Sequence, residues 1–190
     1  MLTRRSLSLL IVLCVVFPTA GRAQVLLTQQ EALRLAFPGP AAIERRTAFL
    51  SEEELARAEN LAGSDVEVEQ RVITYYIGKS GEEPLGVAYF DAHRVRTLPE
   101  VLMIVVTPNA RIERIEILKF QEPPDYLVPE SWLGQFSGRE LSEELSVKGS
   151  IVNMTGATLT SRAIANAARR ILALHRVINP LSAYEEKEPS

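Results

Sequence analysis

A continuous apolar run at residues 101–107 restricts the fold of this 190-residue chain more than any other feature. Such a run is typical of a central strand in a sheet. Residues 72–78 and 85–90, which precede the run, are rich in β-branched and aromatic side chains, and residues 111–118, which follow it, alternate imperfectly. Turn-forming residues separate these segments. The sequence therefore predicts two hairpins that form an antiparallel sheet.

Helical patterns flank the predicted sheet. Thr28 with Glu31, and Ser51 with Glu54, have the spacing of capping boxes, in which a hydroxyl and a carboxylate bind the first backbone N–H groups of a helix. Near the C-terminus, apolar residues recur with a period of 3.6 residues, which predicts a helix with one buried face. The expected elements are helices over residues 32–37, 52–62 and 158–178 and a strand over residues 43–50. The predicted fold class is α+β, an antiparallel sheet with flanking helices and a long C-terminal helix.

The first residues of the chain have the composition of an export signal. Arg4 and Arg5 precede an apolar run, and small residues up to Ala23 fit a cleavage site before Gln24. The run is about eleven residues long, shorter than the roughly 20 residues that a membrane-spanning helix needs. We expect an exported, periplasmic protein, with retention of the signal as a membrane anchor as the alternative. The expected organisation is a signal peptide at residues 1–23, one domain at 24–181 and a disordered tail at 182–190.

Cysteine content and charge exclude several classes of function. Cys14, the single cysteine, lies inside the predicted signal peptide. A mature chain would have no thiol for disulfides, nucleophilic catalysis, iron–sulfur clusters or cysteine-type zinc sites. Two histidines give little basis for a metal or haem site. Removal of Arg4, Arg5 and Arg22 would leave 18 of the 21 basic residues against 24 acidic ones, which argues against nucleic acid as a partner.

Residues 155–161, with the sequence TGATLTS, join an extended segment to the start of the predicted C-terminal helix. A helix N-terminus has unpaired backbone N–H groups and a positive dipole end, so it suits a phosphate, and Gly156 would let the backbone approach one. Thr155 is a candidate helix cap, and Thr158, Thr160 and Ser161 would place three more hydroxyls around the same point. A helix cap without any ligand is the alternative interpretation of these residues.

TGATLTS resembles the flavinylation motif of the FMN-binding domain family, whose members include components of the sodium-pumping NADH:quinone reductase and of the Rnf complex. The resemblance implies that residues 24–181 form an FMN-binding domain and that FMN is attached through a phosphoester bond to Thr158 Oγ. It also implies a Mg-dependent flavin transferase, which installs the FMN, and membrane or periplasmic redox proteins as partners. Val152 stands where the family often has Asp. The implied cofactor-binding residues of the motif are Thr155, Gly156, Ala157, Thr158, Leu159, Thr160 and Ser161.

Aromatic residues shortly before the motif are candidates for stacking on a flavin ring. Tyr126, Trp132 and Phe136 could supply the flat apolar wall that such a ring needs. Trp132 and Phe136 are four residues apart. The alternative is that this pair only holds a short helix against the core.

Three cationic side chains form the densest basic group of the sheet region: His93, Arg94 and Arg96. They could neutralise the flavin phosphate or the electron-rich reduced ring. In a continuous strand, Arg94 and Arg96 would share one face and His93 would lie on the other. Solvation of these cations, without any ligand, is the alternative. The surrounding run of residues 93–100 also resembles exported members of the family.

Electron relay is the function that these residues favour. A flavin held on Thr158 would supply the redox chemistry, while the protein would tune its potential and access. The chain has no Gly-x-Gly-x-x-Gly nicotinamide-binding pattern, so we expect an electron-transfer flavoprotein rather than a self-sufficient oxidoreductase. The competing interpretation is a cofactor-free exported binding or structural module. A hydrolase is disfavoured because the motif contains no histidine to activate a hydroxyl.

Overall fold

The computed structural model describes residues 24–185. The predicted signal peptide, residues 1–23, and the end of the predicted tail, residues 186–190, lie outside the described residues. Among the residues that are described, no helix is both long enough and apolar enough to cross a membrane.

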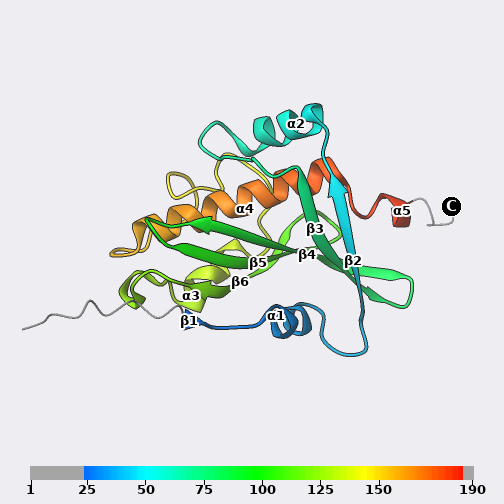
Figure 1. Cartoon of the computed structure of the whole chain (residues 1–190), viewed down its shortest axis with the longest axis horizontal. Helices are drawn as coiled ribbons and strands as arrows, with labels where there is room; N and C mark the ends of the chain where they lie inside the picture. The colour runs from blue at the N-terminus through cyan, green and yellow to red at the C-terminus, as the bar shows by residue number, and fades with distance from the viewer. Residues whose placement is uncertain (1–23, 186–190) are drawn as a thin grey trace, which may run out of the picture.

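A six-stranded antiparallel sheet forms the centre of the molecule, with the strand order β1-β6-β5-β4-β3-β2 (Figure 1). Each strand from β3 to β5 pairs with its successor in the chain, as expected for consecutive hairpins. The α+β class predicted from the sequence is confirmed. The strands are β1 (Gln24–Val25), β2 (Ala42–Phe49), β3 (Val72–Ser80), β4 (Glu83–Arg94), β5 (Pro99–Val106) and β6 (Ile112–Phe120).

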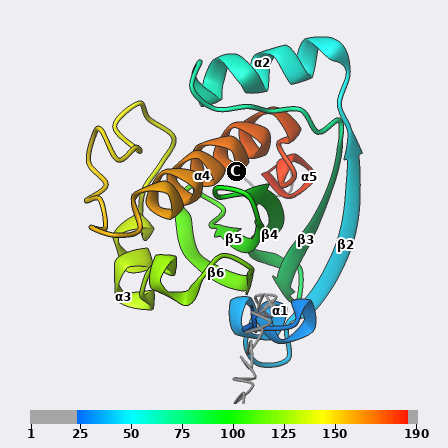
Figure 2. The same ribbon diagram turned by 60° about the vertical axis from the view of Figure 1, so that its left-hand side comes forward.

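Helices cover both faces of this sheet, which gives three layers (Figures 1 and 2). The long helix α4 packs across one face with α2 outside it, and α1 lies on the opposite face. Short helical segments cover the β6 side of the sheet. The helices are α1 (Gln29–Ala36), α2 (Glu52–Ala62), α3 (Glu130–Leu133), α4 (Thr158–Ile178) and α5 (Ser182–Glu185), and the 3-10 segments are η1 (Pro124–Tyr126) and η2 (Gly134–Phe136).

Strand β5 shows why residues 101–106 are apolar throughout. Leu102 and Ile104 face the large core beneath α2 and α4, whereas Met103 and Val105 face the smaller core beneath α1. Successive side chains of a strand point to opposite faces, so a strand that is covered on both sides needs no polar positions. The predicted central strand is therefore confirmed, and it contributes to both cores.

Both predicted capping boxes are present. The Thr28 side chain accepts a hydrogen bond from the Glu31 backbone N–H, and the Glu31 carboxylate accepts one from the Thr28 N–H. Ser51 and Glu54 form the same pair of bonds at the start of α2. These local contacts fix the first residues of two helices that pack on opposite faces of the sheet.

The largest differences from the predicted boundaries lie at the end of β4 and at the C-terminus. Strand β4 extends to Arg94, beyond the predicted end at residue 90, because it pairs with β5 as far as Arg94 and Pro99. At the C-terminus, Ser182–Glu185 form the short helix α5 where the sequence predicts a disordered tail. Tyr184 of this helix packs against the large core, which composition alone does not reveal.

Candidate functional site

Helix α4 begins at Thr158, at the position that the sequence predicts, but without the predicted cap. Ala157 is the N-cap residue, and no side chain caps the helix. Thr155 is not the cap because a turn separates it from the helix, with the Ala157 N–H donating to the Met154 carbonyl. Gly156 has φ of 88°, a left-handed conformation that favours glycine. The first N–H groups of α4, which have no partner within a helix, are therefore left without a side-chain cap.

The hydroxyls of the motif do not cluster around one point. Thr160 is 1% exposed and donates to the Tyr126 carbonyl at 2.7 Å. Ser161 is fully buried and donates to the Ala157 carbonyl at 3.0 Å, one turn back along α4. Thr155 and Thr158 are exposed. The hydroxyls of Thr160 and Ser161 therefore donate to backbone carbonyls inside the protein, whereas those of Thr155 and Thr158 are accessible from solvent.

Asn153 distinguishes Thr158 from Thr155. Its amide nitrogen donates to Thr158 Oγ at 3.1 Å, which holds the hydroxyl at the helix N-terminus. The preceding residue, Val152, is fixed at both of its backbone polar groups: its carbonyl accepts from Trp132 Nε1, and its N–H donates to Gln135 Oε1, each at 2.7 Å. The loop that presents Thr158 is therefore anchored to the segment from α3 to η2.

A cavity of about 140 Å³ adjoins Thr158. Seven of the predicted flavin-contacting residues line it, together with Val95, which was not predicted. The side chain of Leu159, 43% exposed, leaves one edge of the cavity apolar and open to solvent. The lining residues are Val95, Arg96, Tyr126, Gly156, Ala157, Thr158, Leu159 and Thr160.

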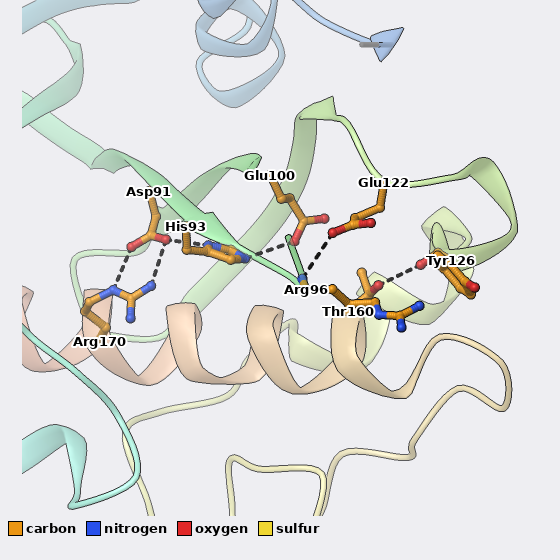
Figure 3. Close-up of polar contacts among 8 residues, drawn as sticks. All are labelled: Asp91, His93, Arg96, Glu100, Glu122, Tyr126, Thr160 and Arg170. Atoms are coloured by element: carbon orange, nitrogen blue, oxygen red, sulfur yellow. Dashed lines mark hydrogen bonds and ion pairs between the residues drawn. The ribbon is translucent and has the colours of Figure 1, made fainter. Parts of the chain in front are cut away.

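The wall opposite the motif consists of Arg96 and Tyr126. The Arg96 guanidinium lies over the Tyr126 ring, 5.3 Å from its centroid, in a cation–π contact. The Tyr126 carbonyl accepts the hydrogen bond from Thr160, so this wall is tied directly to the first turn of α4 (Figure 3). Positive charge is thereby placed beside a helix N-terminus, a combination that favours an anionic group.

Glu122 holds the loop that carries Arg96. One of its carboxylate oxygens accepts hydrogen bonds from three consecutive backbone N–H groups, those of Arg96 at 3.2 Å and of Thr97 and Leu98 at 2.8 Å. Figure 3 shows the bond from Arg96. The bond from Leu98, opposed by partial burial and supported by the bonds from Thr97 and Arg96, lowers the pKa of Glu122. A carboxylate that stays ionised is the strongest acceptor for such a loop.

Trp132 and Phe136, the other predicted stacking residues, do not line this cavity. Trp132 is 7% exposed and packs against Phe136, with their ring centroids 5.5 Å apart. Both belong to the large core. The alternative interpretation, a pair that fixes a short helix to the core, is the one that the structure supports.

His93 and Arg94 also lie away from the small cavity. They line a second hollow of about 510 Å³, which is bordered by Asn166 and Arg170 on later turns of α4. Because β4 ends at Arg94, Arg96 lies in a loop, and the expectation that Arg94 and Arg96 share a strand face is wrong. The predicted basic group is thus divided, with only Arg96 beside Thr158.

Several residues that shape this region are not among those predicted from the sequence. Asp91 and His93 share a strand face, which their i, i+2 spacing could have indicated. Glu100 and Glu122 had no local signal, because each meets its partners through pairing of β4, β5 and β6. Within the described range, residues 24–185, no group of three or more His, Cys, Asp or Glu side chains could hold a metal ion.

Comparison with known protein families gives a match over part of the chain. Residues 99–173 match the family model of the FMN-binding domain. Over these residues the chain is similar to the FMN-binding domain family. The match begins at the first residue of β5 and ends within α4, so it includes Glu122, Tyr126 and the whole TGATLTS motif. No curated protein matches the chain.

The FMN-binding domain indicates a flavin-binding protein, and the cavity suits one end of FMN. The uncapped helix N-terminus and Arg96 suit the phosphate. A volume of about 140 Å³ is below the roughly 300 Å³ at which pockets begin to bury a whole ligand of drug size. The residues present therefore fit the phosphate end of FMN better than the whole cofactor.

Proposed function

We propose that this protein carries FMN in a phosphoester bond to Thr158 and relays electrons between exported redox partners. The observation that carries the proposal is the separation of the motif's hydroxyls. Thr160 and Ser161 are buried on backbone carbonyls, whereas Thr158 is exposed, lines the cavity and is held by Asn153. Thr155 is exposed but lies outside the cavity lining.

Attachment needs an external flavin transferase that takes FMN from FAD. Thr158 Oγ would form the new bond to phosphorus, AMP would leave from FAD, and AMP would take up the hydroxyl proton. Arg96 and the N-terminus of α4 would stabilise the resulting phosphodiester, because both place positive charge at the cavity. Thr158 is then an anchor that reacts once and takes no further part in turnover.

A relay role follows from how little of the cofactor the cavity can enclose. Bound FMN would supply one- and two-electron redox chemistry. Since the cavity fits only the phosphate end, the covalent bond would retain the cofactor and the ring would stay accessible to membrane or periplasmic partners. Leu159 would present an apolar edge to such a partner. Export to the periplasm is supported by the predicted signal peptide at residues 1–23.

Intact mass after co-expression with a flavin transferase tests the proposal. Wild-type protein should gain the mass of one FMN less one water, and Thr158→Ala should gain nothing. Thr47→Ala is the matched control, since Thr47 is an exposed threonine on β2 outside the motif, and we expect it to keep the modification. Unmodified wild-type protein under these conditions would contradict covalent attachment and leave a cofactor-free module as the better account.

A further inference from the structure

His93 bridges two buried carboxylates at the base of the loop that carries Arg96 (Figure 3). Its Nδ1 lies 2.7 Å from Asp91 Oδ1, and its Nε2 lies 3.0 Å from Glu100 Oε2. Asp91 in turn accepts two hydrogen bonds from Arg170 of α4, each at 2.8 Å. The four side chains form a continuous row from α4 through β4 to β5.

This geometry requires a doubly protonated imidazole when both carboxylates are ionised. A carboxylate only accepts hydrogen bonds, so each ring nitrogen of His93 must then donate one. The imidazolium and the Arg170 guanidinium balance the two carboxylate charges. Glu100 is fully buried, and its second oxygen has no hydrogen-bond partner among the described residues, so His93 is the one partner that the structure shows for this carboxylate.

The bridge closes the hairpin from which Arg96 projects. His93 and Glu100 are register partners in β4 and β5, and Arg94 pairs with Pro99. Between them the chain turns through residues 95–98, with the Val95 N–H donating to the Leu98 carbonyl at 3.2 Å. Glu122 binds the other side of this turn. His93 and Glu122 therefore hold the Arg96 loop from two directions.

We propose that protonated His93 is a positioning residue for the Thr158 site: by bridging Asp91 and Glu100 it holds residues 95–98 so that Arg96 lies over Tyr126. Loss of the imidazole proton would remove one of the two bonds and loosen the loop. The effect on a flavin rests on the proposed function, whereas the bridge itself is a property of the protein without cofactor.

Several charged groups determine when His93 loses this proton. Burial lowers its pKa, but hydrogen bonds to Asp91 and Glu100 outweigh burial and raise the pKa to about 9. The bridge should therefore be complete at neutral pH and be lost as the pH rises through about 9. The ionisable groups around His93 are Asp91 on β4, Glu100 on β5, Arg170 on α4, Arg94 at the end of β4, and Asp65, Glu67 and Glu69 across the larger hollow.

Nuclear magnetic resonance of the unloaded full chain tests the bridge. With two histidines in the sequence, His93→Gln identifies the imidazole signals of each. His175 is an internal control because burial lowers its pKa to about 4, so it should stay neutral across the alkaline range. We expect ¹⁵N shifts of an imidazolium for His93 at pH 7, with a midpoint near pH 9, and the same midpoint for the amide signals of Arg96, Thr97 and Leu98.

The outcomes of these titrations distinguish the proposed role of His93 from the proposed attachment of FMN to Thr158. An ordinary midpoint near pH 6.5 for His93 would overturn the positioning role. The same would follow if the amide signals of residues 96–98 did not change as His93 titrates. A titrating loop in a protein that never accepts flavin would leave the bridge intact and refute only the attachment. In flavin-loaded protein, the anisotropy of the flavin fluorescence should fall with the same alkaline midpoint, because the loosened loop would hold the flavin less firmly. His93→Gln should abolish that midpoint; if this variant fails to fold, the wild-type titration alone decides.

Discussion

At the scale of single residues, Arg96 gives the Thr158 site its charge. Its guanidinium is the cation that lines the small cavity, and it lies over Tyr126. Replacing it with Gln should slow flavin transfer to Thr158 by about tenfold, because the loss of about 1.4 kcal/mol of charge stabilisation corresponds to that factor. Arg96→Lys should recover part of the rate. Initial rates of flavin incorporation measure the effect, and Arg57→Gln on the exposed side of α2 is the control that should change nothing.

Asp91 is the residue on which the buried charges depend most. It accepts hydrogen bonds from both His93 and Arg170, so Asp91→Asn would leave two partly buried cations without their shared anion. We expect a loss of about 3 kcal/mol in the free energy of unfolding. Glu52→Gln removes an ion pair with Arg71 that is mostly exposed and should cost below about 1 kcal/mol. Equal costs in urea unfolding would show that the buried row does not stabilise the fold.

At the scale of elements, the turn into α4 needs a glycine for its backbone rather than for space. A Cβ at Gly156 would meet nothing within 4 Å, yet φ is 88°. Gly156→Ala should cost about 1–2 kcal/mol and reduce flavin attachment, because the strained turn moves Thr158. Gly138 has φ of 75° and equally open surroundings, far from the motif in sequence. Gly138→Ala should therefore cost as much stability in urea unfolding while leaving attachment intact; equal attachment by both variants would contradict the role of the turn.

The same scale explains what could be predicted from the sequence. Thr28 and Ser51 predict the starts of their helices because each capping residue and its glutamate partner are three residues apart in sequence. The apolar run of β5 and the start of α4 at Thr158 were likewise local signals. Arg96 and Glu122 meet because β4, β5 and β6 lie side by side, and no local pattern encodes that contact. A buried aromatic residue such as Trp132 and a ligand-stacking one look alike in sequence, so sequence alone does not separate the two roles.

At the scale of the whole molecule, the two histidines limit the pH range over which the fold is most stable, His93 on the alkaline side and His175 on the acid side. His93 has a pKa raised to about 9 in the folded protein, so its contribution is complete below its ordinary 6.5 and is lost as the pH rises through about 9. Burial lowers the pKa of His175 to about 4, so its contribution is complete above 6.5 and is lost as the pH falls towards 4.

The pH dependence of unfolding should show both limits. We expect the free energy of unfolding, followed by Trp132 fluorescence in urea, to fall on either side of about pH 6.5. His93→Gln should flatten the alkaline limb alone, and His175→Gln the part of the acid limb between about pH 6.5 and 4. A single limb that both variants abolish would show that the two sites are coupled, contrary to their separate surroundings beside Glu100 and Tyr89.

The central claim, that one hydroxyl of four is the flavin anchor, is tested most directly by locating the added mass. Trypsin cleaves after Lys148 and Arg162, so a single peptide, residues 149–162, contains Thr155, Thr158, Thr160 and Ser161. Fragment ions of this peptide from flavin-loaded protein should place the whole addition between Ala157 and Leu159. An addition on Thr155, or on either buried hydroxyl, would contradict the account.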